Sequence, residues 1–229
     1  MAEEALDIGA GVFQQRKDTW SNFFRARRFP VIERMIADIH ARSGQCRIID
    51  IGGRQEYWNP ILPRLASYNA HITITNLEKV QPDGARHFTF QYGNACDMKE
   101  YETGSFDLAH SNSVIEHVGN WGQISASARE LRRVGRAYYI QTPYFWFPLE
   151  PHFRVPCYHW LPEQMRAGMN MRSRLGYFGR AETLDDAMEN VQSISLLDRR
   201  QFAHLFPDAA VGFERVLGIA KSLIARREA

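Results

Sequence analysis

CRIIDIGG, residues 46–53, is the stretch that decides the fold of this chain. Its β-branched residues form a short, continuous apolar run, which predicts a buried strand over residues 46–51. Gly52 and Gly53 follow directly, and glycines let the backbone turn sharply and approach a ligand closely. The run therefore predicts a strand that feeds a tight turn, and it leaves open whether that turn is an ordinary strand–helix connection or a ligand-binding loop.

Strand and helix patterns alternate along the rest of the chain. Further strands are predicted over residues 71–76, 88–91, 106–111 and 137–141, and again over 211–216 and 219–225. Helices are predicted from Pro30 to a stop at Gly44, and over residues 60–68, 123–133 and 199–206. This order predicts an α/β fold in which a mostly parallel, seven-stranded sheet has helices on both faces.

One long segment interrupts this alternation. Residues 143–191 begin as an aromatic, proline-containing loop and continue into two predicted helices, directly after the fifth strand. Ligands of open α/β sheets bind at the carboxyl ends of the strands, so an insertion there is placed to cover a site. We expect a single domain over residues 1–229, with an N-terminal helical segment over residues 1–44 and a lid or substrate-recognition segment over residues 143–191.

Composition excludes several classes of protein. With 229 residues and 45% hydrophobic residues, the chain can bury a substantial core. Its formal net charge of +2 does not predict a protein that coats polyanions. We find neither an apolar run of about 18 residues nor an apolar secretory signal. Three widely spaced cysteines fit free thiols, so we expect a cytoplasmic protein with no membrane partner.

Polar clusters follow the first four strands. Asn76 ends the second strand, GNACD at residues 93–97 follows the third, and SNSVIEH at residues 111–117 follows the fourth. Because the carboxyl ends of parallel strands meet at one edge of a sheet, these clusters and the Gly52-Gly53 turn are expected to lie together.

This ordered set resembles the class I S-adenosylmethionine-dependent methyltransferases over about residues 47–225. The segments at residues 141–153, 206–208 and 214–215 are similar to those of small bacterial methyltransferase type 11 proteins. The resemblance implies a Rossmann-like fold and S-adenosyl-L-methionine as cofactor. The chain departs from the family's Gly-x-Gly-x-Gly pattern, because GGRQE at residues 52–56 keeps only the opening glycine in place.

The resemblance also implies which residues hold the cofactor. Asp50, Gly52 and Gly53 would shape the loop under its methionine part, and Arg54 would pair with its carboxylate or face solvent. Asn76 stands where the family has an acidic residue for the ribose, with Glu78 as the charged alternative. Asn94 and the backbone N–H of Ala95 would contact the adenine. Ser111 and Asn112 would line the methionine end of the cofactor.

Two histidines fall on the predicted active edge. His117 follows the fourth strand, and His152 lies in the sequence Glu150-Pro151-His152, where the carboxylate could orient the imidazole. We expect at least one of them to remove a proton or position the acceptor, with helix capping and loop anchoring as the structural alternatives. His152, Cys157 and His159 lack a second ligand cluster, so no metal is predicted.

The aromatic segment predicts an apolar pocket, an anchor for the lid, or both. Four residues are predicted to bind substrate: Tyr144, Trp146, Tyr158 and His159. We expect methyl transfer to a hydroxyl or amine of a small metabolite, such as a sugar or a secondary metabolite. The alternatives are a methyltransferase of RNA or protein, and a non-catalytic nucleoside-binding scaffold. No concentrated basic stripe indicates a nucleic-acid partner, and a homodimer is allowed. The basic residues spread along the chain are expected to face solvent: Arg25, Arg27, Arg28, Arg132, Arg133, Arg136, Arg226 and Arg227.

Overall fold

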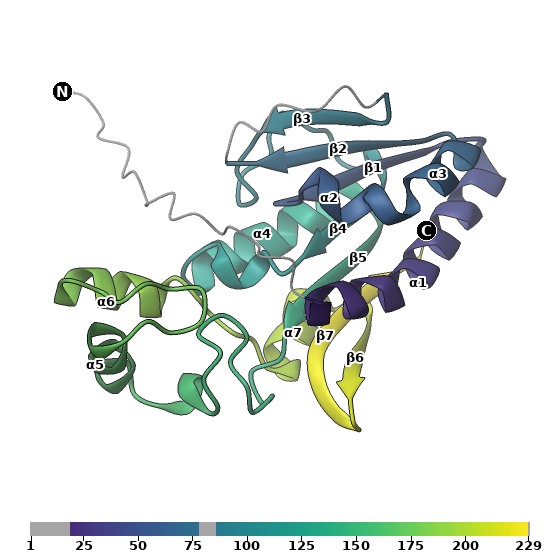
Figure 1. Ribbon diagram of the computed structural model, residues 1–229. Helices are drawn as coiled ribbons and strands as arrows, with labels where there is room; N and C mark the ends of the chain where they lie inside the picture. Colours follow the sequence, from purple (N-terminus) through teal and green to yellow (C-terminus); the bar gives the residue numbers. More distant parts are fainter. Residues whose placement is uncertain (1–18, 78–85, 229) are drawn as a thin grey trace, which may run out of the picture.

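Seven strands form one sheet in the order β3-β2-β1-β4-β5-β7-β6 in the computed structural model, which describes residues 19–77 and 86–228 (Figure 1). The strands are β1 (Cys46–Ile51), β2 (Ala70–Asn76), β3 (Phe88–Tyr92), β4 (Phe106–Asn112), β5 (Gly135–Pro143), β6 (Ala210–Val216) and β7 (Ile219–Arg227). The first five strands pair in parallel, and β7 is antiparallel to both of its neighbours, β5 and β6. The predicted mostly parallel, seven-stranded α/β fold is confirmed.

Helices cover both faces of this sheet. On one face, α1 (Thr19–Ser43) and the short helices α2 (Gln55–Trp58) and α3 (Leu62–Leu65) pack on β1 and β2 through an apolar cluster that includes Ile36 and Trp58. On the other face, α4 (Trp121–Val134) and α7 (Arg199–Leu205) pack through a second cluster that includes Leu131 and Phe202. The sheet is therefore the middle layer of three.

The local sequence accounts for where α4 begins. Asn120 accepts hydrogen bonds from the backbone N–H groups of Gly122 and Gln123, and the Gln123 side chain bonds back to the Asn120 N–H. This reciprocal pair satisfies donors that the first helical turn leaves unpaired. Ile124, Ala128 and Leu131 then recur at helical spacing and are all buried against the sheet.

The first helix differs from its prediction. It begins at Thr19 rather than at Pro30, so the proline lies inside it. Proline removes one helical hydrogen bond, to the carbonyl four residues earlier, which is that of Ala26. Both Pro30 and Ala26 are exposed, so water can reach that carbonyl, and Phe24 and Phe29 extend the buried face on the N-terminal side.

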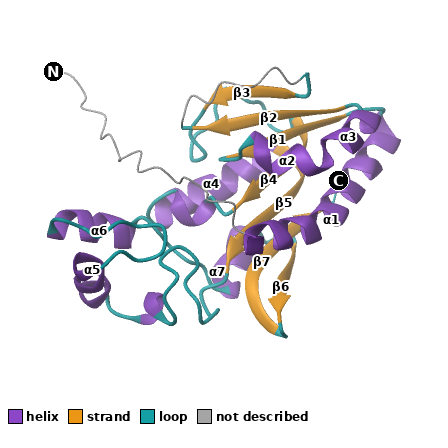
Figure 2. Cartoon of the chain, viewed as in Figure 1, coloured by secondary structure: helices purple, strands orange, loops and turns teal. Residues whose placement is uncertain are grey.

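The predicted lid segment, residues 143–191, folds beside the sheet with an apolar cluster of its own. It contains η4 (Tyr158–Trp160), α5 (Glu163–Arg172) and most of α6 (Leu184–Gln192), joined by long loops (Figure 2). Phe153, Tyr158, Ala187 and Val191 form the centre of its cluster. The two helices therefore pack on each other rather than on the sheet.

The strand order reverses between β1 and β4, which are neighbours although two strands separate them in sequence. At such a switch point, the loops that leave the carboxyl ends of the two strands diverge and open a crevice. This point of the fold lies between the Gly52-Gly53 turn and the segment that begins at Ser111. No helix of the described residues has the length and apolar character needed to cross a membrane.

Candidate active site

The glycine turn after β1 is required by the packing of the chain itself. Gly52 has φ +67°, and a Cβ there would lie 2.6 Å from a Val114 methyl group. A Cβ at Gly53 would lie 1.8 Å from the Asp50 carboxylate. A larger side chain at either position would overlap neighbouring side chains of the protein itself, even without a bound ligand. The glycines alone therefore do not identify a ligand-binding loop.

Asp50 supports this turn from inside the core. It is 1% exposed, and its two oxygens accept hydrogen bonds from Trp58 Nε1 at 2.7 Å and from His110 Nδ1 at 2.6 Å. The other ring nitrogen of His110 lies 3.3 Å from the Tyr57 hydroxyl. Asp50 therefore holds the turn through buried partners of its own, and its predicted role under the cofactor stays a prediction.

Asn76 lies beside the turn. It ends β2, and its side-chain amide donates to the Gly53 carbonyl over 3.3 Å. Arg54 is exposed and extended, with φ −139° and ψ 148°, directly before α2. These residues hold the predicted positions at the carboxyl edge of the sheet, whereas Glu78 lies outside the described residues.

The predicted adenine residues form a tight turn after β3. The Asn94 side chain accepts a hydrogen bond from the Cys96 backbone N–H at 2.9 Å, and Asn94 pairs with Asp97 in an isolated bridge. Asn94 is exposed and Ala95 is half-buried. The turn thus presents a polar edge to solvent at the end of the strand.

Ser111 and Asn112 end β4 next to the turn. The Ser111 hydroxyl donates to the Ile51 carbonyl at 3.3 Å, which ties β4 to β1. Asn112 accepts a hydrogen bond from Arg28 Nη1 at 2.5 Å. Arg28 also donates to Gln141 and makes two bonds, of 2.8 and 2.6 Å, to the Glu214 carboxylate.

The interpretation of the arginines as solvated is wrong for Arg28. This side chain is 5% exposed and links α1 to β4, β5 and β6. Burial alone would lower its pKa, but the hydrogen bonds and the charge of Glu214 raise the pKa above its usual value. The guanidinium therefore stays charged and fixes Asn112 at the edge of the site.

Both predicted catalytic histidines meet at one place. His152 Nε2 lies 3.1 Å from His117 Nε2, although 35 residues separate them. His152 Nδ1 bonds Glu150 Oε1 at 2.7 Å, and the backbone N–H groups of His152 and Phe153 both donate to Glu150 Oε2. The predicted orientation of His152 by Glu150 is therefore present in the structure despite the intervening proline.

A fourth group, Glu116, adjoins the histidine pair. It is fully buried; its Oε2 accepts from the Thr142 hydroxyl at 2.9 Å and its Oε1 lies 3.9 Å from His117 Nε2. Burial raises the pKa of Glu116. Burial, and then the neighbouring His152, lower the pKa of His117 to about 3. Glu116 was not predicted as a site residue, although it directly precedes His117 in the segment after β4.

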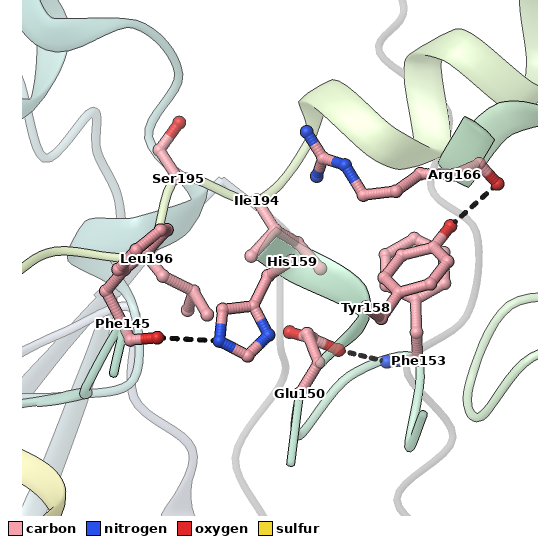
Figure 3. Close-up of a pocket in the computed structure, with 9 residues that line it drawn as sticks. All are labelled: Phe145, Glu150, Phe153, Tyr158, His159, Arg166, Ile194, Ser195 and Leu196. Atoms are coloured by element: carbon pink, nitrogen blue, oxygen red, sulfur yellow. Dashed lines mark hydrogen bonds between the residues drawn. The ribbon is translucent and has the colours of Figure 1, made fainter. Parts of the chain in front are cut away.

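A cavity of about 250 Å³ lies in the lid next to this cluster. Figure 3 shows its lining residues, with His159 and Glu150 in the middle of the view and the Arg166 side chain on the helix beyond them. His159 Nε2 bonds the Phe145 carbonyl at 2.6 Å, while its Nδ1 and Arg166 Nε are buried and have no hydrogen-bond partner among the described residues. The lining thus offers polar nitrogen atoms inside an aromatic wall.

Two of the four predicted substrate residues line this cavity, namely Tyr158 and His159. The Tyr158 hydroxyl donates to the Arg166 carbonyl, so it also anchors the lid. Tyr144 and Trp146 are not among the lining residues: Tyr144 packs its ring on Phe213, and Trp146 is 57% exposed.

The sequence matches no family model, and no curated protein matches it. In structure, the chain is similar to a 1,6-didemethyltoxoflavin-N1-methyltransferase from Burkholderia thailandensis solved with S-adenosylhomocysteine (TM-score 0.50, 14% identity, covering 93% of this chain and 82% of that one). It is also similar to the trans-methyltransferase CalH in complex with SAH (TM-score 0.51, 13% identity, covering 85% and 55%). A third similar structure is the CurJ carbon methyltransferase (TM-score 0.50, 14% identity, covering 81% and 49%).

At these identities the likeness concerns the fold. The chain has the Rossmann-like fold of the class I S-adenosylmethionine-dependent methyltransferases, as the sequence resemblance implied. It spans about half the length of two of these three proteins, at 55% and 49%. The narrower resemblance to methyltransferase type 11 proteins stays a prediction.

Proposed function

We propose that this chain is an S-adenosylmethionine-dependent methyltransferase that acts on a hydroxyl or amine of a small metabolite. The observation that carries the proposal is the contact between His152, from the lid, and His117, at the end of β4. It brings proton-accepting nitrogen atoms to the edge of the sheet where this fold binds ligands.

The residues at that edge fit the cofactor in position and in chemistry. The turn at Gly52-Gly53 and the side chain of Asn76 adjoin one another, and Ser111 ties the neighbouring strand to the same turn. Asn76 offers an amide for the ribose hydroxyls, and Arg54 offers a cation for the cofactor carboxylate. The bound cofactor supplies a methyl group already activated on a sulfonium.

The protein then has to align the acceptor and take up its proton. His152, held through Nδ1 by Glu150, presents Nε2 toward His117, so either ring can serve as the base. Enclosure by the lid would exclude water and fix the acceptor in line with the methyl group.

The lid cavity supports a small acceptor. Its volume of about 250 Å³ lies just below the range of ordinary ligand pockets, which begin at about 300 Å³, so it has room only for a small molecule or for part of one. The buried Arg166 Nε can donate a hydrogen bond to an oxygen atom of the acceptor, an acidic or phosphorylated group included. His159 donates through Nε2 to the Phe145 carbonyl, so its Nδ1 can accept a hydrogen bond from a hydroxyl of the acceptor.

Calorimetric titration with S-adenosylmethionine and S-adenosylhomocysteine tests the proposal. We expect binding of both ligands, and we expect Arg54→Ala to weaken it about tenfold or more because a charge-assisted bond contributes about 1.5–3 kcal/mol. Arg64→Ala is the matched control, because Arg64 lies in α3 and pairs with Glu33. Failure of the wild-type protein to bind either ligand would overturn the proposal in favour of a scaffold.

Transfer of a labelled methyl group then identifies the acceptor class. Extracts divided into small molecules, RNA and protein should show label in the small-molecule fraction. His152→Ala should bind the cofactor nearly normally and transfer the label about a hundred- to ten-thousand-fold more slowly. Label that enters only RNA or protein would contradict the small acceptor and leave methyl transfer in place.

A further inference from the structure

Three side chains with metal-binding atoms converge between the lid and the end of β4. Glu116 and His117 come from η3 (Ile115–His117), and His152 comes from the lid. One ligand atom from each lies within 4.8 Å of the others, and this is the one such group found among residues 19–77 and 86–228. Cys157 and His159, considered with His152 from the sequence, do not belong to it.

The hydrogen bonds around the two rings fix where their protons are. His152 Nδ1 faces the Glu150 carboxylate at 2.7 Å, and His117 Nδ1 faces the Ser193 carbonyl at 3.3 Å. Both partners, a carboxylate and a backbone carbonyl, accept hydrogen bonds, so each Nδ1 carries a hydrogen in the tautomer assigned from this network. Each neutral ring then has its lone pair on Nε2, and the two Nε2 atoms face each other. A cation between them removes the repulsion of these lone pairs.

The distances suit a metal ion in that position. Imidazole nitrogen atoms bind zinc at about 2.0–2.1 Å, so two of them on one ion lie about 2.9 Å apart at a right angle and about 3.4 Å apart at a tetrahedral angle. The observed separation of His117 Nε2 and His152 Nε2 is 3.1 Å. Both rings therefore already have a spacing at which they can share one ion.

Glu116 supplies an oxygen that lacks another partner. Its Oε1 is buried, has no hydrogen bond among the described residues and lies 3.9 Å from His117 Nε2. A buried carboxylate oxygen without a donor is costly, whereas a bound cation would compensate it. A shared proton could bridge the two rings, but it would leave this oxygen without a partner.

The groups behind these ligands are also in place. Glu150 holds His152 through Nδ1 and is itself fixed by two backbone N–H groups, and Thr142 holds the far oxygen of Glu116. Carboxylates that bond the outer nitrogen of a ligating histidine orient the ring and raise its basicity. We propose that Glu116, His117 and His152 form a site for one divalent first-row transition ion of the zinc class.

This inference goes beyond the proposed methyl transfer and does not depend on it. In the metal-free chain an Nε2 atom of the pair can accept the proton, whereas in the metal-loaded chain both Nε2 atoms would bind the ion and a water in its open position would take that role. Two imidazoles and one carboxylate make a donor set used by zinc and by ferrous iron, and they leave at least one position for water or a substrate oxygen. Because His152 belongs to the lid and the other two ligands follow β4, an ion would join the lid to the sheet.

Titration of the full chain, after dialysis against a chelator, tests the site. Zn²⁺ followed by calorimetry and Co²⁺ followed by its visible absorption should each bind at one ion per chain, and Zn²⁺ should raise the melting temperature. His117→Gln and His152→Gln should each weaken binding more than a hundredfold. Glu150→Gln should weaken it about ten- to a hundredfold, because Glu150 only orients His152.

His159→Gln is the matched control, since this histidine also lies in the lid and its Nε2 bonds the Phe145 carbonyl. It should bind Zn²⁺ as the wild-type protein does. Glu116→Gln keeps an amide oxygen for Thr142, so a loss of affinity there reports the lost ligand charge rather than misfolding. Absence of stoichiometric binding, or equal binding by the wild-type protein and both histidine variants, would overturn the site whatever the result with S-adenosylmethionine.

Discussion

Replacement of Arg28 tests how α1 is held to the site. In Arg28→Met, the Glu214 carboxylate, which is 8% exposed, loses both of its guanidinium bonds, and the ammonium of Lys221 stays 3.8 Å away. Removal of one partner of a buried ion pair costs about 3–5 kcal/mol, because the other charge stays buried. For a chain of this size, each kcal/mol lowers the melting temperature by about 2–4 °C, so we expect a loss of about 6–20 °C.

Urea denaturation followed by circular dichroism measures the loss in the free energy of unfolding, and thermal denaturation measures the loss in melting temperature. The double variant Arg28→Met/Glu214→Met should recover much of it, because no buried charge is left unpaired. Arg64→Met is the matched control: Arg64 pairs with Glu33 but is 57% exposed, and exposed pairs contribute about 0–1 kcal/mol. A loss below about 1 kcal/mol in Arg28→Met, or no recovery in the double variant, would refute the reasoning.

Three further predictions concern the turn and the histidine pair. Trp58→Phe should cost about 1–3 kcal/mol in denaturant titrations, because the buried Asp50 oxygen loses its donor. Gly53→Ala should cost a similar amount, since its Cβ would meet Asp50, whereas Gly168→Ala, with open space around it, should be neutral or stabilising. In metal-free protein, the unfolded chain binds a proton at His117 between about pH 3 and 6.5 that the folded chain does not bind, so the free energy of unfolding rises with pH across this window. His117→Gln should flatten that rise in urea midpoints measured from about pH 4.5 to 7.5, and an unchanged slope would contradict the lowered pKa.

The positions of the site residues along the fold followed from the sequence. Asn76, Ser111 and His117 were predicted at strand ends on one edge of the sheet, and the structure places them there. The hydrogen-bond partners of these residues could not be predicted from the sequence, because the partners come from distant segments of the chain. Arg28 and Glu214 are 186 residues apart, and no local pattern relates them.

The sequence by itself determined the seven strands, their alternation with helices and the place of the lid segment. Each of these depends on residues within a few positions of one another: β-branched runs such as residues 46–51, helical spacing and glycine turns. The start of the first helix was predicted wrongly at Pro30, because the proline lies inside α1 and the carbonyl that it leaves without a donor belongs to the exposed Ala26.

Only the tertiary structure decided which polar side chains share a site. The path of the chain brings His152 to His117, leaves one oxygen of Glu116 without a hydrogen bond and buries Arg28 as a charged link between α1 and the sheet. The cost of burying a charge or a polar atom depends on which partners surround it in space. The local sequence contains the residue types, whereas packing across the whole chain sets their distances, and those distances determine what the cluster can bind.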